Sequence, residues 1–260
     1  VLFRSTDPMN FTNWQDEPVN AQEFSRRVFS VMTGLKENLG KDYSIVMEPY
    51  HDFDPEYLKA QPEIARELGC DPDMNAYTMQ PNAMPEGDVF FRTTAGHIHI
   101  GWGKDIPIDH PDHLAVCAQT VKALDAYIGV LSTVLDPDVR RRQLYGKAGA
   151  FRPKSYGVEW RTPSNFWIIN DNRRRWMFYA VEFVLSRLAN NFEGAPNSLF
   201  TSATQALKPY SEEEVQRIIN EGDTSWFVRE SYRANQWDSG RVKTFWNQVQ
   251  KLPQPQVETA

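Results

Sequence analysis

The fold is decided by a short alternating stretch, Gly96-His97-Ile98-His99-Ile100-Gly101. Successive side chains of a β-strand point to opposite faces, so His97 and His99 share one face while Ile98 and Ile100 enter the core. The flanking glycines permit close approach of a ligand. A single histidine is most simply interpreted as an exposed or hydrogen-bonded side chain. A His-x-His pair on an otherwise apolar strand instead favours a ligand site.

A second stretch has the same alternation, Tyr156-Gly157-Val158-Glu159-Trp160-Arg161. Glu159 and Arg161 project from one face, where they form either a structural ion pair or part of a site. If the two strands are neighbours in one sheet, two histidines, a carboxylate and a guanidinium share a face. Such a set is typical of a divalent cation that carries an anionic ligand, with arginine on phosphate oxygens.

The segment between these strands, 140–154, is basic and contains glycines. We interpret Arg140 and Arg141 as part of a solvated loop. Lys147 and Arg152 flank small residues just before the Glu159 strand, a pattern that suits polyphosphate binding. No Walker A or Gly-x-Gly-x-x-Gly motif supports this interpretation.

A turn-rich run lies further upstream, Gly69-Cys70-Asp71-Pro72-Asp73. Turn formation alone explains Asp-Pro-Asp. The functional alternative makes Asp71 or Asp73 a carboxylate that binds a metal or an amine. Cys70 is interpreted as a small packing residue, because nothing in the neighbouring sequence would lower its pKa.

Apolar spacing, capping residues and turn signals predict one α+β domain. The expected strands are 43–48, 88–94, 97–101 and 156–162. The expected helices are 20–39, one or two within 55–68, 109–135, 171–190, 212–222, 224–234 and 241–252.

Composition limits the partners. The chain has 260 residues, a formal net charge of −6 and a mean hydropathy of −0.56, which argue against a general nucleic-acid coat. The two cysteines, Cys70 and Cys117, make no disulfide framework, so we expect a cytoplasmic location. Its most apolar stretch, 176–188, is interrupted by Glu182 and Arg187, so no membrane association is expected.

The chain begins without methionine, and we expect its reading frame to be truncated at the N-terminus. Residues 1–5 are interpreted as a foreign or unstructured start, 6–252 as a single incomplete domain, and 253–260 as a loose tail.

Taken in order, several motifs resemble the phage-type carboxylate–amine ligases (COOH·NH2 ligase, type 2) of the glutamine synthetase and glutamate–cysteine ligase superfamily. The resemblance covers about residues 20 to 190. It rests on the run 69–73, Arg92, the run 96–101, Gly146-Lys147-Ala148-Gly149 and the run 156–167.

The resemblance implies a glutamine synthetase-like domain, in which helices pack on one face of a curved, mostly antiparallel sheet. The other face would bind ATP and Mg²⁺ or Mn²⁺. The implied reaction has two steps: ATP phosphorylates a carboxylate to an acyl phosphate, and an amine then attacks it to form an amide. The implied partners are a small-molecule or peptide carboxylate and an amine, in a host cytoplasm if the gene belongs to a phage or prophage. Self-association is permitted but not indicated.

The resemblance also implies residue roles. His97 and Glu159 would share a metal ion, with Asp71 and Asp73 as further metal ligands.

For the nucleotide, the resemblance implies that His99 contacts an ATP phosphate. Arg152 and Arg161 would stabilise the transferring phosphoryl group, and both would bind the nucleotide. Lys147 and Arg92 would supply additional phosphate or carboxylate contacts.

One departure from the family pattern concerns the metal. The family normally begins with a strand pair that carries further acidic residues, upstream of Val1 in this numbering. Without those residues the cations would be under-coordinated, so we expect this chain to be weakly active or inactive and the full-length protein to be an active ligase.

Two alternatives remain open. A cupin-like metalloenzyme also uses His-x-His on a strand, but it needs a glutamate a few residues later, and 101–104 holds no carboxylate. A non-catalytic binding or virion-associated module could retain the same fold.

Overall fold

A computed structural model of the protein describes residues 20–66, 73–83, 89–102, 107–136, 138–188 and 210–226. The interpretations of residues 1–5 and 253–260, of Cys70 and Asp71, and of the helix 241–252 concern residues outside these ranges. Of the expected helix 224–234, only the first three residues are described.

Two antiparallel sheets form from six strands of the described chain. The larger sheet has the order β2-β5-β6-β4, and the smaller one pairs β1 with β3. The strands are β1 (Tyr50–Asp52), β2 (Met74–Asn75), β3 (Phe91–Thr93), β4 (Ile98–Gly101), β5 (Ala150–Lys154) and β6 (Gly157–Trp160). The expected strands 88–94 and 97–101 are therefore confirmed in position but belong to different sheets.

The expected strand 43–48 is wrong, because these residues have no regular structure and β1 begins only at Tyr50. Tyr43 and Val46 are 73% and 57% exposed. A strand composition without a surface to pack against does not make a strand.

The core helix of the protein runs from His113 to Leu135 in three consecutive parts. These are α4 (His113–Leu124), a π-helical turn η1 (Asp125–Gly129) and α5 (Val130–Leu135). The α4 part packs against β5 and β6. By length and composition the whole helix qualifies as a candidate membrane span, but 56% of its most apolar window is buried inside the protein. It therefore serves here as the central core helix.

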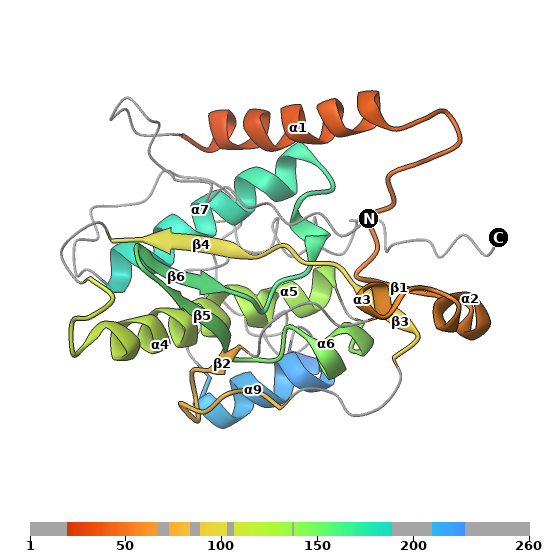
Figure 1. Cartoon of the computed structure of the whole chain (residues 1–260). Helices are drawn as coiled ribbons and strands as arrows, with labels where there is room; N and C mark the ends of the chain where they lie inside the picture. The colour runs from red at the N-terminus through yellow and green to blue at the C-terminus, as the bar shows by residue number, and fades with distance from the viewer. Residues whose placement is uncertain are drawn as a thin grey trace.

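Two long helices pack against each other beside this core. α1 (Ala21–Asn38) begins where the sequence predicts, because the Asn20 side chain accepts a hydrogen bond from the Glu23 backbone N–H at 2.9 Å. Only the first half of its predicted apolar stripe is buried, and Val31 is 69% exposed. α1 lies along α7 (Asp171–Leu188), as Figure 1 shows.

The remaining helices of the described residues are short. They are α2 (Pro55–Lys59), α3 (Glu63–Arg66), α6 (Arg140–Leu144), the 3₁₀ turn η2 (Asn165–Trp167) and α9 (Glu212–Glu221). α2 and α3 confirm the two short helices expected within 55–68. The prediction of one continuous basic loop over 140–154 is wrong, because α6 and β5 occupy most of this segment.

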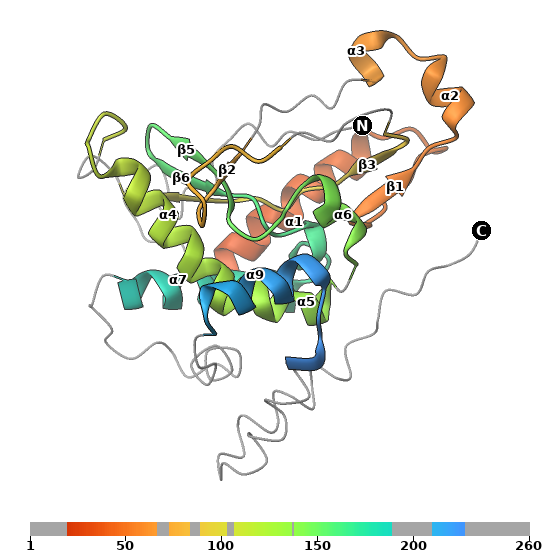
Figure 2. The same ribbon diagram turned by 90° about the horizontal axis from the view of Figure 1, so that it is seen from below.

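The helices α4, α5, α7 and α9 lie on one side of the larger sheet (Figure 2). On that side the sheet buries Ile98, Ile100, Phe151, Val158 and Trp160, each at most 4% exposed. The fold is α+β, as expected. A glutamine synthetase-like arrangement stays a prediction.

Candidate active site

The strands that carry the predicted site residues are direct neighbours. β4 and β6 pair with His99 opposite Glu159, and β5 pairs with β6 with Arg152 opposite the same glutamate. Residues opposite each other in a sheet point to the same face. The predicted gathering of both histidines, Glu159 and Arg161 on one sheet face is therefore confirmed as geometry.

Glu159 is the centre of this gathering. Its Oε1 accepts hydrogen bonds from His97 Nδ1 at 2.8 Å and from Arg161 Nη1 at 2.6 Å, and its Oε2 lies 2.9 Å from Lys154 Nζ. The glutamate side chain is only 6% exposed. Burial opposes its ionisation, but the hydrogen bonds from His97 and Lys154 and the charge of Arg161 hold its pKa well below the usual range. Glu159 is therefore a carboxylate that fixes three nitrogen groups.

Arg161 connects Glu159 to a second carboxylate. Its Nε lies 3.2 Å from Asp73 Oδ2, and the other Asp73 oxygen accepts a hydrogen bond from Asn82 Nδ2 at 2.8 Å. Both charged side chains are buried. Of the two aspartates singled out in the turn, Asp73 joins the predicted site residues, whereas Asp71 lies outside the described residues.

The two histidines are neutral at pH 7 and differ in their hydrogen bonding. Burial is the main cause that lowers the pKa of His97 to about 4, against the opposing effect of Glu159. Because the carboxylate of Glu159 can only accept, His97 Nδ1 carries the proton, which leaves a lone pair on Nε2. His99 Nδ1 lies 2.5 Å from the Tyr156 hydroxyl, and burial likewise lowers its pKa. An imidazole nitrogen is a better acceptor than a phenol oxygen, so this pairing favours Tyr156 as donor and an N–H on His99 Nε2.

Arg152 lies on the same face, whereas Lys147 lies in the turn that leads into β5. Arg152 is half-buried and stands opposite Glu159 in the register. Lys147 is half-buried in a turn between Gly146 and Gly149, whose φ angles of 78° and 81° favour glycine. The Lys147 carbonyl oxygen lies 3.2 Å from the Thr162 hydroxyl, so the turn lies beside the segment that follows β6.

Arg92 is not brought to this face. It belongs to β3 in the smaller sheet. Its guanidinium donates to the carbonyl oxygens of Val89, Phe91, Ala65 and Arg66, at 2.9–3.3 Å. These contacts give Arg92 a structural role at the end of α3.

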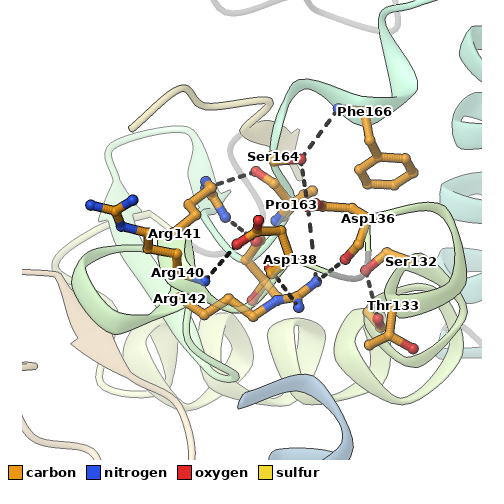
Figure 3. Close-up of polar contacts among 12 residues, drawn as sticks. Ser132, Thr133, Asp136, Asp138, Arg140, Arg141, Arg142, Pro163, Ser164 and Phe166 are labelled. Carbon is orange, nitrogen blue, oxygen red and sulfur yellow. Dashed lines mark hydrogen bonds and ion pairs between the residues drawn. The ribbon is translucent and has the colours of Figure 1, made fainter. Parts of the chain in front are cut away.

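Arg141 supports the site from behind, and its interpretation as a solvated loop residue is wrong. It is 1% exposed, and burial lowers its pKa to about 10, so it stays charged at neutral pH. Its nitrogens donate to the carbonyl oxygens of Thr94 at 2.7 Å, Thr162 at 2.8 Å, Pro163 at 3.0 Å and Arg161 at 3.3 Å. Figure 3 shows Arg141 beside Pro163. Arg141 thereby joins the segment before β4 to the chain that leaves β6. No apolar period or motif distinguishes it in sequence from its exposed neighbour, Arg140.

A buried carboxylate next to Arg141 extends this support. Asp136 Oδ2 accepts a hydrogen bond from the Ser164 hydroxyl at 2.6 Å and lies 3.8 Å from Arg142 Nη2 (Figure 3). At the same place, any side chain at Gly96 would overlap the Ser164 carbonyl oxygen. The close approach that Gly96 permits is therefore an approach of backbone.

The described residues, as arranged, do not fit a divalent metal ion. Among them no group of three or more histidine, cysteine, aspartate or glutamate side chains is placed to hold one. Both oxygens of Glu159 already accept from nitrogen groups, and both oxygens of Asp73 are likewise engaged by Arg161 and Asn82.

The same face does fit an anionic ligand. Three cationic side chains, Arg152, Lys154 and Arg161, stand against two carboxylates, Asp73 and Glu159, and both histidines are neutral. Counted over these described residues alone, the face has one positive charge in excess, and Lys154 and Arg161 are held in place by Glu159.

Comparison with known proteins identifies the family. The model of the phage phiEco32-like COOH·NH2 ligase, type 2, matches residues 86–253, which is more than half of the chain. Neither a curated protein nor a solved structure matched. The match begins at residue 86, whereas the resemblance seen in the sequence begins at about residue 20. The matched range therefore contains both histidines, Glu159 and Arg161 but not the turn that contains Asp73. Its members are named as ligases that join a carboxyl group to an amine, an enzyme class that forms carbon–nitrogen bonds. The chain belongs to the phage phiEco32-like COOH·NH2 ligase family, type 2.

Proposed function

We propose that this protein is an ATP-dependent carboxylate–amine ligase, encoded by a phage or prophage, that works through an acyl phosphate in the host cytoplasm. The observation that carries the proposal is the cluster of Arg152, Lys154 and Arg161 on the polar face of the sheet. Family membership supplies the class of bond that is formed.

The reaction requires positive charge at one place. A carboxylate oxygen of the acid attacks the γ-phosphorus of ATP, the bond to the bridging oxygen breaks, and ADP leaves with the electron pair. Both reactants are anions, so cationic donors that are fixed beforehand lower the barrier. In the second step the amine attacks the acyl carbon, phosphate leaves, and the nitrogen gives up a proton.

The contacts of the described residues support a proposed role for each group. Arg161 is held by Glu159 and Asp73, which leaves its orientation little freedom and suits the transferring phosphoryl group. Arg152 is less buried and suits the same group or the acid. With a proton on Nε2, His99 can donate to a phosphate oxygen.

The two other predicted nucleotide contacts, Lys147 and Arg92, differ in how well the structure supports them. Lys147 stands on the turn that leads into β5 and remains a candidate for the terminal phosphates. The four carbonyl contacts of Arg92 do not favour its predicted role in nucleotide binding.

Metal dependence stays a prediction that rests on the family resemblance. Mg²⁺ is typically bound through one or two carboxylates together with substrate phosphates. Glu159 with His97 and Asp73 are the described candidates, but their present hydrogen bonds would have to be exchanged. We therefore assign no step of the reaction to a metal.

The same hydrogen bonds favour one other candidate. A site in which each carboxylate is already neutralised by a nitrogen group also fits a non-catalytic binding module that retains the fold. A cupin-like metalloenzyme is less favoured, because the described residues provide no metal-ligand group.

The experiment compares ATP binding and turnover in wild type, Arg152→Ala and the matched control Arg26→Ala. Arg26 is an exposed arginine of α1, paired with Glu23 on the helix surface. With Mg²⁺ and a panel of acids and amines, wild type is expected to bind ATP, and ADP release, expected to be weak in this chain, is measured alongside. Arg152→Ala is expected to bind ATP about tenfold more weakly, since it loses one charge-assisted contact. The control should match wild type within about twofold.

Two results would contradict the proposal. Wild type that binds no ATP and releases no ADP with any pair of substrates would favour the binding module. Equal ATP affinity in wild type and Arg152→Ala would place the nucleotide away from this face.

A further inference from the structure

Asp125 is a fully buried carboxylate on the side of the sheet away from the candidate site. It is 0% exposed and opens the π-helical turn in the core helix, which runs beneath β5 and β6 (Figure 2). A π-helical turn is uncommon and often marks a functional region. No sequence motif singles out this residue, and the proposed reaction does not use it directly.

Four hydrogen bonds converge on this carboxylate, all from uncharged groups. Oδ1 accepts from Trp160 Nε1 and from the Thr162 hydroxyl, both at 2.8 Å. Oδ2 accepts from the Gly149 backbone N–H at 2.5 Å and from the Tyr77 hydroxyl at 3.4 Å. The indole and backbone N–H groups can only donate, and one of them contacts each oxygen. Both oxygens of Asp125 must therefore act as acceptors.

Two of the donors fix the strand that carries the central carboxylate. Trp160 lies between Glu159 and Arg161 in sequence, so its indole points to the core while both neighbours point to the site. Thr162 directly follows Arg161. Through these two contacts Asp125 holds Trp160 and Thr162, the two residues that flank Arg161 in the sequence.

The other two donors lie in the turn that leads into β5 and in the segment that follows β2, the strand beside β5. Gly149 closes the turn that presents Lys147 and leads into the strand of Arg152. Tyr77 follows β2, which is entered from Asp73. Three separate segments of the chain that bear candidate site residues thus meet at one carboxylate.

We propose that Asp125 is a positioning residue of the ligase site, which holds β6, the turn 146–149 and the segment after β2 in a fixed relation to one another. Burial raises the pKa of Asp125 to about 6, and none of the donors described around this carboxylate is a cation. An apolar group in its place would leave the Trp160 indole and the Gly149 N–H without this acceptor.

The substitution Asp125→Asn tests this proposal sharply because it keeps the size of the side chain. An amide has one oxygen and one NH₂ group, so the NH₂ must face a donor-only group, either the Trp160 indole or the Gly149 N–H. One anchor is lost whichever way the amide turns. Thr162→Val is the milder second variant, which removes one hydroxyl. Thr120→Val is the matched control, because Thr120 is a buried threonine of the same helix that bonds only the Val116 carbonyl in the described chain.

Two measurements are made on each variant: the dissociation constant of ATP, and the NMR signals of the His97 and His99 imidazoles. We expect Asp125→Asn to weaken ATP binding about tenfold or more and to shift both imidazole signals, since small displacements of positioned groups have large effects. Thr162→Val should produce smaller changes in the same direction. Thr120→Val should leave both unchanged while it tests for any general loss of stability.

The outcomes distinguish this inference from the proposed function. Only the ATP measurement rests on the proposed function, and the imidazole signals do not. If wild type binds no ATP, the proposed function fails, and the imidazole signals alone decide the positioning role. Unchanged imidazole signals in Asp125→Asn would overturn that role, as would equal losses in Asp125→Asn and Thr120→Val. If Asp125→Asn does not fold, Thr162→Val decides: signals identical to wild type would overturn the inference.

Discussion

At the scale of single residues, the candidate site is organised by one carboxylate and the protonation states it imposes. Glu159 holds Arg161 and Lys154 by charge and fixes the proton of His97 on Nδ1. The presence of the two histidines on one face follows from their spacing in the sequence. Their neutral state does not, because it depends on burial and on the partners that the fold supplies.

The protonation of His97 predicts how stability depends on pH. Its pKa is lower in the folded protein, about 4, than the ordinary value of about 6.5. The unfolded chain therefore binds more protons between these values, and His97 makes the protein lose stability as the pH falls through this window. Asp125, with its raised pKa of about 6, acts in the opposite direction as the pH falls from about 6 to 4.

The variant His97→Asn isolates the histidine contribution, because its amide can still donate to Glu159 while it cannot be protonated. Urea unfolding between pH 7 and pH 4 should show wild type losing stability relative to His97→Asn. The control His51→Asn replaces an exposed histidine and should run parallel to wild type. Parallel curves for wild type and His97→Asn would mean that His97 is not held neutral by the fold.

At the scale of elements, periodic sequence patterns predicted the long helices and both site strands. The sequence predicted one helix over 109–135, which in the structure begins only at His113, and alternation predicted β4 and β6. The π-helical turn was not predictable, because no change in apolar spacing marks it; it begins at Asp125, whose hydrogen bonds to Gly149 and Trp160 join distant parts of the chain. The strand expected at 43–48 failed for the related reason that no sheet receives it. The sequence also could not tell Arg140 from Arg141, because one residue of offset on α6 separates solvent from core.

These adjacent arginines give a matched pair of substitutions. Arg141→Met should lower the free energy of unfolding by about 3 kcal/mol or more, because several buried carbonyls lose a charged donor. Arg140→Met should cost less than about 1 kcal/mol, since its pair with Asp52 is on the surface, with side chains 40% and 57% exposed. Urea unfolding at neutral pH measures both. Equal losses would refute the assignment of Arg141 as the buried link between the segment before β4 and the segment after β6.

At the scale of the whole molecule, the two faces of the larger sheet differ in what they carry. One face packs on the core helix and is anchored through Asp125, and the opposite face gathers cations, carboxylates and neutral histidines from β4, β5 and β6. The sequence predicted this face because alternation fixes which side chains share a side. Pairing of β4 with β6 was an added assumption, since strand order depends on contacts far apart in the chain. The part played by Lys154 emerged only from the structure, which places its ammonium on Glu159.

The most direct test of the account is an NMR titration of the wild-type protein with ATP and Mg²⁺, in which all five histidine imidazoles are followed and assigned by single substitutions. The signals of His97 and His99 should shift together and saturate, while those of the exposed His51 and His110 stay in place. Saturating shifts at His51 or His110 with none at His97 and His99, or no shifts at all, would contradict the claim that this sheet face binds the nucleotide.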